Sequence, residues 1–269
     1  MRPVSSSRLW LVASLCLLSW GSADAGGHNS SARAHAFTAL PDWTGLWLSA
    51  AWPTEVSGRP AGGDAVLKQT LQLIRPPPYN PVWKAKYDEG MKDTAALAKL
   101  GATFKVCTRG FPAVMEAPWM FQVAVLPEET LLIFENQQVR HVYTDGREHP
   151  SEDDLWPTRL GHSIGHWRGD TLVIDTVARK DEPLAPRAWL SQLSERAHFT
   201  EELRLIDKDT LQDDLTIDDP VTLAHPWQIK LTYMRVSQMD RLLDWDCAEN
   251  DLNPVVDGKM TITSPGDAR

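Results

Sequence analysis

Nine short segments of alternating apolar and polar residues follow one another along the chain between residues 119 and 247. Alternation places successive side chains on opposite faces of a β-strand, and turn residues such as those at 127–129 and 168–170 separate the segments. Gaps of a few polar residues between such segments are typical of hairpins. The nine segments are residues 119–126, 130–135, 138–144, 162–167, 171–177, 198–206, 210–217, 227–236 and 241–247.

This series predicts a mainly β fold in which consecutive strands pair as an antiparallel meander. One or two further strands are expected near the N-terminus, where Trp43, Gly45 and Trp47 form a pattern similar to the first strand of lipocalin-like barrels. A long meander tends to curl and close, because closure leaves no unpaired edge. We therefore expect a lipocalin-like barrel or a strongly curved sheet. Apolar residues spaced by three and four between Pro81 and Gly101 add one packed helix.

The first 25 residues have the layout of a secretory signal peptide. A basic start is followed by the apolar stretch LWLVASLCLLSW and by Ala23 and Ala25, which form a cleavage signal. The stretch is shorter than the roughly 20 residues that cross a bilayer. We expect cleavage near Ala25, a periplasmic or secreted chain without membrane attachment, a disordered leader over 26–40 and a single domain over 41–269.

Composition narrows the partners. The formal net charge of −9, without basic clusters, argues against nucleic acid or an anionic membrane as a partner. Once the signal is removed, Cys107 and Cys247 are expected to form a disulfide in an oxidising compartment, and two separate buried thiols are the alternative. The 12 tryptophans, against 4 tyrosines, would either fill a wide β core or line a pocket for a flat aromatic ligand.

Residues 161–165 read G-H-S-I-G and match G-x-S-x-G, the pattern that places the serine of lipases and esterases on a turn from a strand to a helix. The neighbouring residues do not fit this context. The segment before Gly161 is polar and contains Pro157, and the pair Gly169-Asp170 predicts a hairpin turn. An α/β hydrolase also needs repeated strand–helix units. A serine hydrolase using Ser163 is therefore the least favoured function.

The same segment contains His162 and His166 with H-x-x-x-H spacing, which can bind zinc on a helix. On a strand this spacing covers roughly 13 Å, too far for both rings to reach one ion at about 2 Å. We expect no metal ion bound by this pair. A metal site formed by residues of separate strands is the alternative. If His162 faces the barrel interior near its mouth, it would be a good acid or base near neutral pH. The alternative is a histidine that only bonds a neighbouring loop.

Three parts of the sequence resemble a large family of exported bacterial proteins. They are VRHVYTDGREHP at 139–150, GHSIGHWRGDTLVIDT at 161–176, and TIDDP at 216–220 with HPW at 225–227. The resemblance runs from about residue 41 to residue 250. The polar positions that match the family pattern are Tyr143, Asp145, Arg147, His149, His162, Asp170, Asp175, His198 and Glu201.

Two positions depart from the family pattern. The glutamate that usually follows the tryptophan of the second block is Arg168 here, and the usual Glu-Arg pair is Glu201-Glu202. If the missing arginine bound an anionic substrate, the ligand of this chain would differ.

The resemblance implies enzymes of lignin-derived aromatic catabolism that act without a cofactor on phenylcoumaran-type dimers, as decarboxylases or related lyases. We therefore expect a cofactor-independent carbon–carbon lyase for a small phenolic or aromatic acid, with a non-catalytic lipocalin-like binding protein as the alternative. The candidate catalytic residues are Tyr143, Asp145, His149, His162, His198 and Glu201. The candidate substrate-binding residues are Arg140, Arg147, Trp119 and Trp167.

The residue types in this set suit acid–base chemistry on a phenolic acid. Arginine can hold a carboxylate with two hydrogen bonds, histidine can move a proton, and tyrosine can donate to a phenolate. Glu201 would orient or activate a histidine. Asp145-Gly146 is also a strong turn pair, so an Asp145 that caps its own turn is an equal alternative.

Overall fold

The computed structural model describes residues 38–51, 77–90, 92, 109–117, 119–180, 193–237, 239–242, 255–256 and 259–260. The expected signal peptide, most of the expected leader and the expected disulfide between Cys107 and Cys247 lie outside the described residues. Among the helices that are described, none is long and apolar enough to cross a membrane.

The alternating segments of the sequence are strands in the structure. Their bounds are β1 Leu46–Ser49, β2 Phe121–Val125, β3 Glu129–Phe134, β4 Val139–Tyr143, β5 His162–Arg168, β6 Thr171–Val177, β7 His198–Asp207, β8 Thr210–Asp218 and β9 Trp227–Val236. Two short strands, β10 Val255–Val256 and β11 Lys259–Met260, form a separate pair. The expected segment at 241–247 adds no strand at residues 241 and 242, and the rest of it lies outside the described residues.

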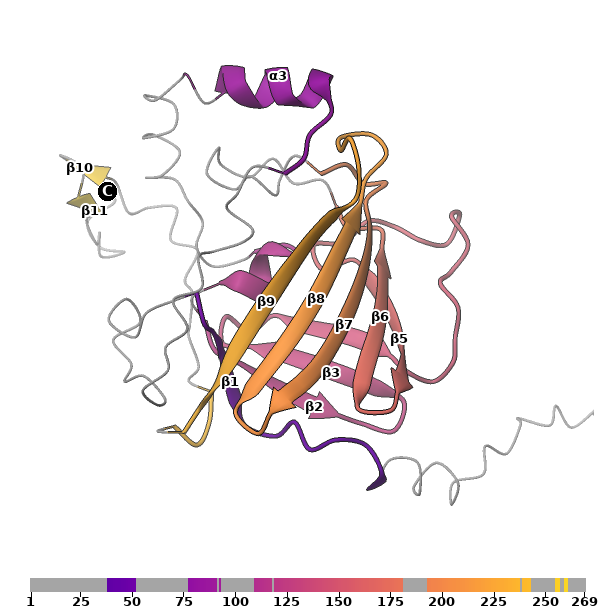
Figure 1. Cartoon of the computed structure of the whole chain (residues 1–269), viewed down its shortest axis with the longest axis vertical. Coiled ribbons are helices and arrows are strands. Elements are labelled where there is room, and N and C mark those ends of the chain that lie inside the picture. The colour runs from indigo at the N-terminus through magenta and orange to yellow at the C-terminus, as the bar shows by residue number, and fades with distance from the viewer. Residues whose placement is uncertain are drawn as a thin grey trace, which may run out of the picture.

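Strands β1 to β9 close into a barrel, in which each strand pairs with its neighbours in sequence and β1 pairs with both β2 and β9. Figure 1 shows β5 to β9 as long strands on the near side and β1 to β3 crossing behind them. The predicted fold class, a mainly β barrel with one helix, is confirmed. Closure leaves no free edge on the main sheet, which is the physical reason for expecting it.

The strand pairing departs from the expected antiparallel order at one place, because β4 and β5 run parallel. Their register contains only two residue pairs, Val142↔Ser163 and Tyr143↔Ile164. Parallel neighbours need a long crossover, and residues 144–161 provide it. The crossover is held beyond the end of β6, where the Thr158 amide donates to the Ala178 carbonyl at 3.0 Å. We call this β4–β5 junction the parallel seam.

Alternation gives most barrel strands one buried face, and β1 is buried at all of its positions. Side chains from every part of the ring, such as Trp47, Phe121, Leu172 and Tyr233, have 2 % exposure or less. Because such side chains are sealed even from water, little open space borders these parts of the interior. The described interior is therefore a packed core in which aromatic rings contact one another, as Phe121 and Tyr233 do at a centroid distance of 4.9 Å.

Helix α3 (Pro81–Gly90) lies beyond one end of the barrel (Figure 1). Asn80 caps it, since its side-chain oxygen accepts from the Trp83 amide at 3.1 Å, and Pro81 occupies the first helical position, where no amide donor is needed. The Asn80 side-chain amide also donates to the Val221 carbonyl in the β8–β9 connection. The helix is thus fixed to the barrel end, with Trp83 and Tyr87 packed against the main core.

Candidate functional site

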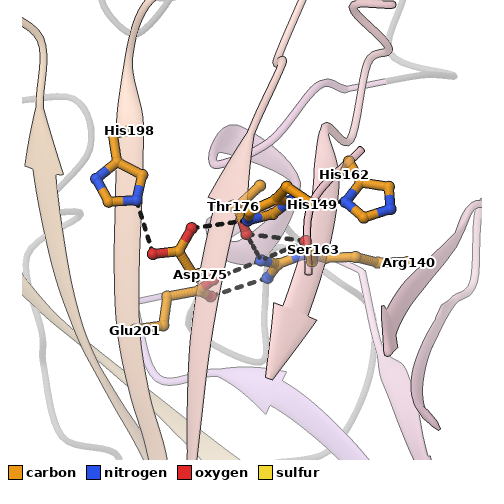
Figure 2. A network of polar contacts seen from close by, with 8 residues as sticks. All are labelled: Arg140, His149, His162, Ser163, Asp175, Thr176, His198 and Glu201. Carbon is orange, nitrogen blue, oxygen red and sulfur yellow. Dashed lines mark hydrogen bonds and ion pairs between the residues drawn. The ribbon is translucent and has the colours of Figure 1, made fainter. Parts of the chain in front are cut away.

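The segment G-H-S-I-G begins strand β5 of the β5–β6 hairpin, as the sequence predicted from the turn at Gly169–Asp170. Its two faces have different surroundings. The Ser163 side chain points into the barrel and is 1 % exposed, whereas His162 lies on the outer face. The condition that His162 faces the interior is therefore not met. One group of polar side chains lies on the inner face of strands β5 to β7, and a second group lies on their outer face (Figure 2).

The inner group is centred on Arg140 of β4. Its guanidinium is 1 % exposed and forms two bonds to the Glu201 carboxylate of β7, one of them at 2.8 Å from Nη1 to Oε1. The same guanidinium donates to Ser163 Oγ of β5 at 3.2 and 3.3 Å and to Thr176 Oγ1 of β6 at 2.8 Å. One side chain therefore connects four strands and bridges the parallel seam from inside.

Ser163 has no histidine partner among the described residues. Its hydroxyl bonds Arg140 and Thr176, the latter at 2.8 Å, inside a sealed core. The two glycines of the segment serve packing. Gly161 has a φ of +74°, and a Cβ at Gly165 would come within 2.9 Å of a Val142 methyl carbon. The segment is built for close strand contact, and its serine does not have the surroundings of an acyl-transfer nucleophile.

The outer group is a hydrogen-bonded series of four side chains, which we call the outer relay: His162, His149, Asp175 and His198 (Figure 2). The Nδ1 atoms of His162 and His149 are 2.8 Å apart. His149 Nε2 lies 2.9 Å from one Asp175 oxygen, and His198 Nε2 lies 2.7 Å from the other. His162, Asp175 and His198 come from β5, β6 and β7, and His149 comes from the crossover loop.

The contacts of the outer relay determine where its protons lie. An ionised Asp175 only accepts, so the histidine nitrogens that face it both carry hydrogen. A neutral His149 then presents a lone pair on Nδ1 and accepts from Nδ1–H of His162, which leaves Nε2 of His162 as a base. Proton uptake at His162 can move its Nδ1 proton to His149, and the positive charge then lies beside the Asp175 carboxylate.

The surroundings separate the titrations of the relay members. Burial lowers the pKa of His162, and repulsion from a protonated His149 and from the Arg147 guanidinium lowers it further. The hydrogen bond to Asp175 raises the pKa of His198 against the opposing effect of burial. Burial acts to raise the pKa of Asp175, but hydrogen bonds from His198 and His149 outweigh it and the pKa is lowered. Groups whose pKa values are pushed apart in this way suit opposite acid and base roles.

These shifts predict two separate histidine titrations in nuclear magnetic resonance of the folded chain. His162 should titrate below the ordinary value of 6.5 and His198 above it. Replacing Asp175 by Asn should lower the His198 midpoint, whereas His141→Gln, which changes a histidine bonded to Glu129, should leave it in place. Equal midpoints for His162 and His198 in the wild type would contradict the relay geometry.

The same shifts give the sign of the pH dependence of stability. The raised pKa of His198 means that its stabilisation is complete below about pH 6.5 and is lost as the pH rises through the folded-state value. Folding instead favours neutral His162, so this contribution is complete above about pH 6.5 and is lost as the pH falls through its lowered value.

An aromatic strip continues from the relay across β4. The Tyr143 ring lies 5.5 Å from the His162 ring, and the Arg147 guanidinium lies 4.1 Å above the Tyr143 ring. Asp145 holds Arg147 with bonds of 2.9 and 2.6 Å, and it also accepts from the Arg147 amide at 3.2 Å. Asp145 thus both shapes its turn and orients Arg147, the side chain of which is 47 % exposed.

The structure places the remaining expected site residues elsewhere. Arg140 and Glu201 bond each other inside the barrel, so Arg140 is not free to hold a substrate and Glu201 does not orient a histidine. Trp119 is 4 % exposed and is approached by Arg109, and the Trp167 ring packs 5.0 Å from the Trp43 ring in the core.

Asp175 links His149 to His198, a role that the sequence reasoning missed. The available signal was its match to the family pattern in the second block, directly before Thr176. The sequence does not give the strand register, which sets Asp175 beside Thr200 and Ile164. It also does not show that the crossover loop brings His149 to Asp175. The sequence contains no periodic signal for a contact of that kind.

The two departures from the family pattern form one contact. Arg168 Nη2 lies 2.9 Å from Glu202 Oε2, across β6 on the outer face. Both side chains are exposed, so the two positions lie together in one surface ion pair.

Among the described residues, no group of three or more histidine, cysteine, aspartate or glutamate side chains is arranged to hold a metal ion. In the outer relay, the nitrogen and oxygen atoms face one another as hydrogen-bond partners. Comparisons with protein-family models, with curated proteins and with solved structures find no match to this chain.

Proposed function

We propose that this chain is an exported, cofactor-independent lyase that breaks a carbon–carbon bond of a small phenolic acid. The observation that carries the proposal is the outer relay, in which a base nitrogen on His162 is connected through His149 to Asp175. General acid–base catalysis requires a group of this kind near neutral pH. The substrate class, lignin-derived phenylcoumaran-type acids, comes from the resemblance of the two long sequence blocks.

A phenol in the substrate supplies the electron sink that cleavage without a cofactor requires. His162 takes the phenol proton, the benzylic C–O bond breaks to give a quinone methide, and the departing ether oxygen takes a proton from the relay. The C–C bond to the carboxylate then breaks, carbon dioxide leaves, and the electron pair forms a C=C bond and restores the phenolate. The phenolate takes a proton from solvent, so one proton is consumed for each carbon dioxide released.

The neighbouring residues support binding of such a substrate. The Tyr143 hydroxyl can bond a phenolic oxygen near His162, and the half-exposed Arg147, which bonds Asp145 through Nε and Nη2, can donate to a carboxylate through Nη1. The positive charge of Arg147 also contributes to the lowered pKa of His162, which keeps His162 a base at neutral pH.

Turnover of phenylcoumaran-type acids tests the proposal. Purified chain without its first 25 residues should convert them to stilbenes, measured by the rise of stilbene absorbance together with release of carbon dioxide. The rate should fall as the pH falls through the lowered pKa of His162, because the protonated ring cannot act as base. Binding of the acids without turnover would instead favour the lipocalin-like binding protein. A chain that neither binds nor converts them would refute the substrate class.

A further inference from the structure

Asp213 of β8 is a fully buried carboxyl group of the barrel interior. It is 0 % exposed, and among the described residues neither of its oxygens has a hydrogen-bond partner. An ionised carboxylate in such a position loses its hydration and receives no hydrogen bond in exchange, which disfavours the charged form. A charged Asp213 would therefore need a cation beside it.

The nearest cation is already engaged. Arg140 directs its guanidinium donors at Glu201, Ser163 and Thr176, with Met115 Sδ 3.9 Å from Nη1. None of its bonds goes to Asp213. Glu201, one strand away on β7, brings a second negative charge to the same interior face. Two carboxyl groups thus share one arginine, and that arginine is committed to Glu201.

The other titratable and charged groups near this position do not supply a positive charge. Tyr233 faces the interior from β9 with a buried hydroxyl that also has no partner among the described residues, and Glu116 approaches from the short helix Ala113–Glu116. Asp214, the next residue, points to the outer face and is paired there with Arg204 and Lys230.

We propose that Asp213 is a proton-binding site of the barrel core, and that it stays protonated in the folded chain at neutral pH. Glu201 keeps its negative charge for Arg140, and Asp213 is held as a neutral acid beside it. Burial raises the pKa of Asp213, and the negative charge of Glu201 raises it further, against the opposing effect of Arg140. Ionisation of Asp213 at alkaline pH would place a second negative charge in the core and loosen the strands that Arg140 connects.

The proposal predicts a specific pH dependence of folding. The folded chain holds a proton on Asp213 that the unfolded chain releases above about pH 4, so the contribution of Asp213 to stability is greatest below that pH and is lost as the pH rises through the folded-state pKa. Because unfolding releases one proton in this range, the unfolding equilibrium constant rises by about tenfold for each pH unit. His198 contributes in the same direction, so the contribution of Asp213 is isolated by substitution.

Denaturant unfolding of the full chain between pH 6 and 9 tests the site, with wild type, Asp213→Asn and Asp214→Asn compared. The slope of the logarithm of the unfolding constant against pH should fall by about one for Asp213→Asn. The adjacent Asp214→Asn, which changes an outer ion pair, should keep the wild-type slope. Equal slopes for wild type and Asp213→Asn would overturn the proposal. If Asp213→Asn does not fold, the test is calorimetry of refolding near pH 8, in buffers of different ionisation enthalpy, of the chain with His198→Gln, which lacks the proton uptake of His198. Uptake of about one proton supports the site, and none refutes it.

Discussion

Replacing Arg140 by Met should lower the free energy of unfolding by about 3–5 kcal/mol, the usual cost of breaking a buried ion pair by removing one partner. The substitution leaves Glu201 buried without its cation and removes the hydrogen bonds that Arg140 donates to Ser163 and Thr176. It also removes the side chain that bridges the parallel seam, where β4 and β5 share only two register pairs. For a domain of this size the loss corresponds to a fall in melting temperature of roughly 6–20 °C.

The matched controls separate the buried pair from a general loss of charge. Arg140→Met combined with Glu201→Gln should recover much of the loss, because the uncompensated charge disappears. Asp88→Asn breaks the exposed Lys84–Asp88 pair of helix α3 and should change the free energy of unfolding by less than about 1 kcal/mol. A loss below about 1 kcal/mol for Arg140→Met alone would show that the inner group does not hold the strands together.

Replacing Asp175 by Asn should lower kcat of the proposed lyase by about 10²-fold or more, the range for loss of a general acid–base group. The change removes the negative charge that both histidines face at 2.9 and 2.7 Å. His149 then loses the carboxylate that orients it. His149→Ala and His162→Ala should each give losses of similar size, measured as kcat on a phenylcoumaran-type acid.

Residues that act as one unit are not additive, so the double variant Asp175→Asn with His149→Ala should be little worse than either single variant. Two nearby substitutions serve as controls. Ser163→Ala changes the inner face of β5, and His141→Ala changes an outer histidine that bonds Glu129, so both should keep kcat within a few fold. Unchanged rates for both His149→Ala and His162→Ala would refute the outer relay as the site.

The local pattern of the chain was enough to place most of the strands. Alternation and turn residues set β6 at residues 171–177 and β9 at residues 227–236, because a strand with one buried face needs an apolar residue at every second position. The same pattern rejected the serine elbow, since a hairpin turn at Gly169–Asp170 leaves no room for the helix that the elbow requires. Alternation also placed His162 and Ser163 on opposite faces.

Alternation alone could not say which of these faces is inside. Ser163 is a polar residue that the core accepts because Arg140 and Thr176 satisfy its hydroxyl, and a hydropathy pattern contains no such information. The hydropathy pattern likewise gives no sign that Arg140 and Glu201 are buried, so both were expected at the candidate site. Charged residues are usually exposed, and only their mutual contact allows burial.

The sequence by itself determined the strands, their turns, the barrel class and the set of polar residues from which the candidate site is drawn. These follow from periodicity and turn chemistry, which act between residues close in the chain. The tertiary structure decided the parallel seam, the separation of the inner Arg140–Glu201 pair from the outer relay, and the place of Asp175 between His149 and His198. Those features depend on which strands become neighbours and where a long crossover returns, and contacts between distant parts of the chain leave no local signal.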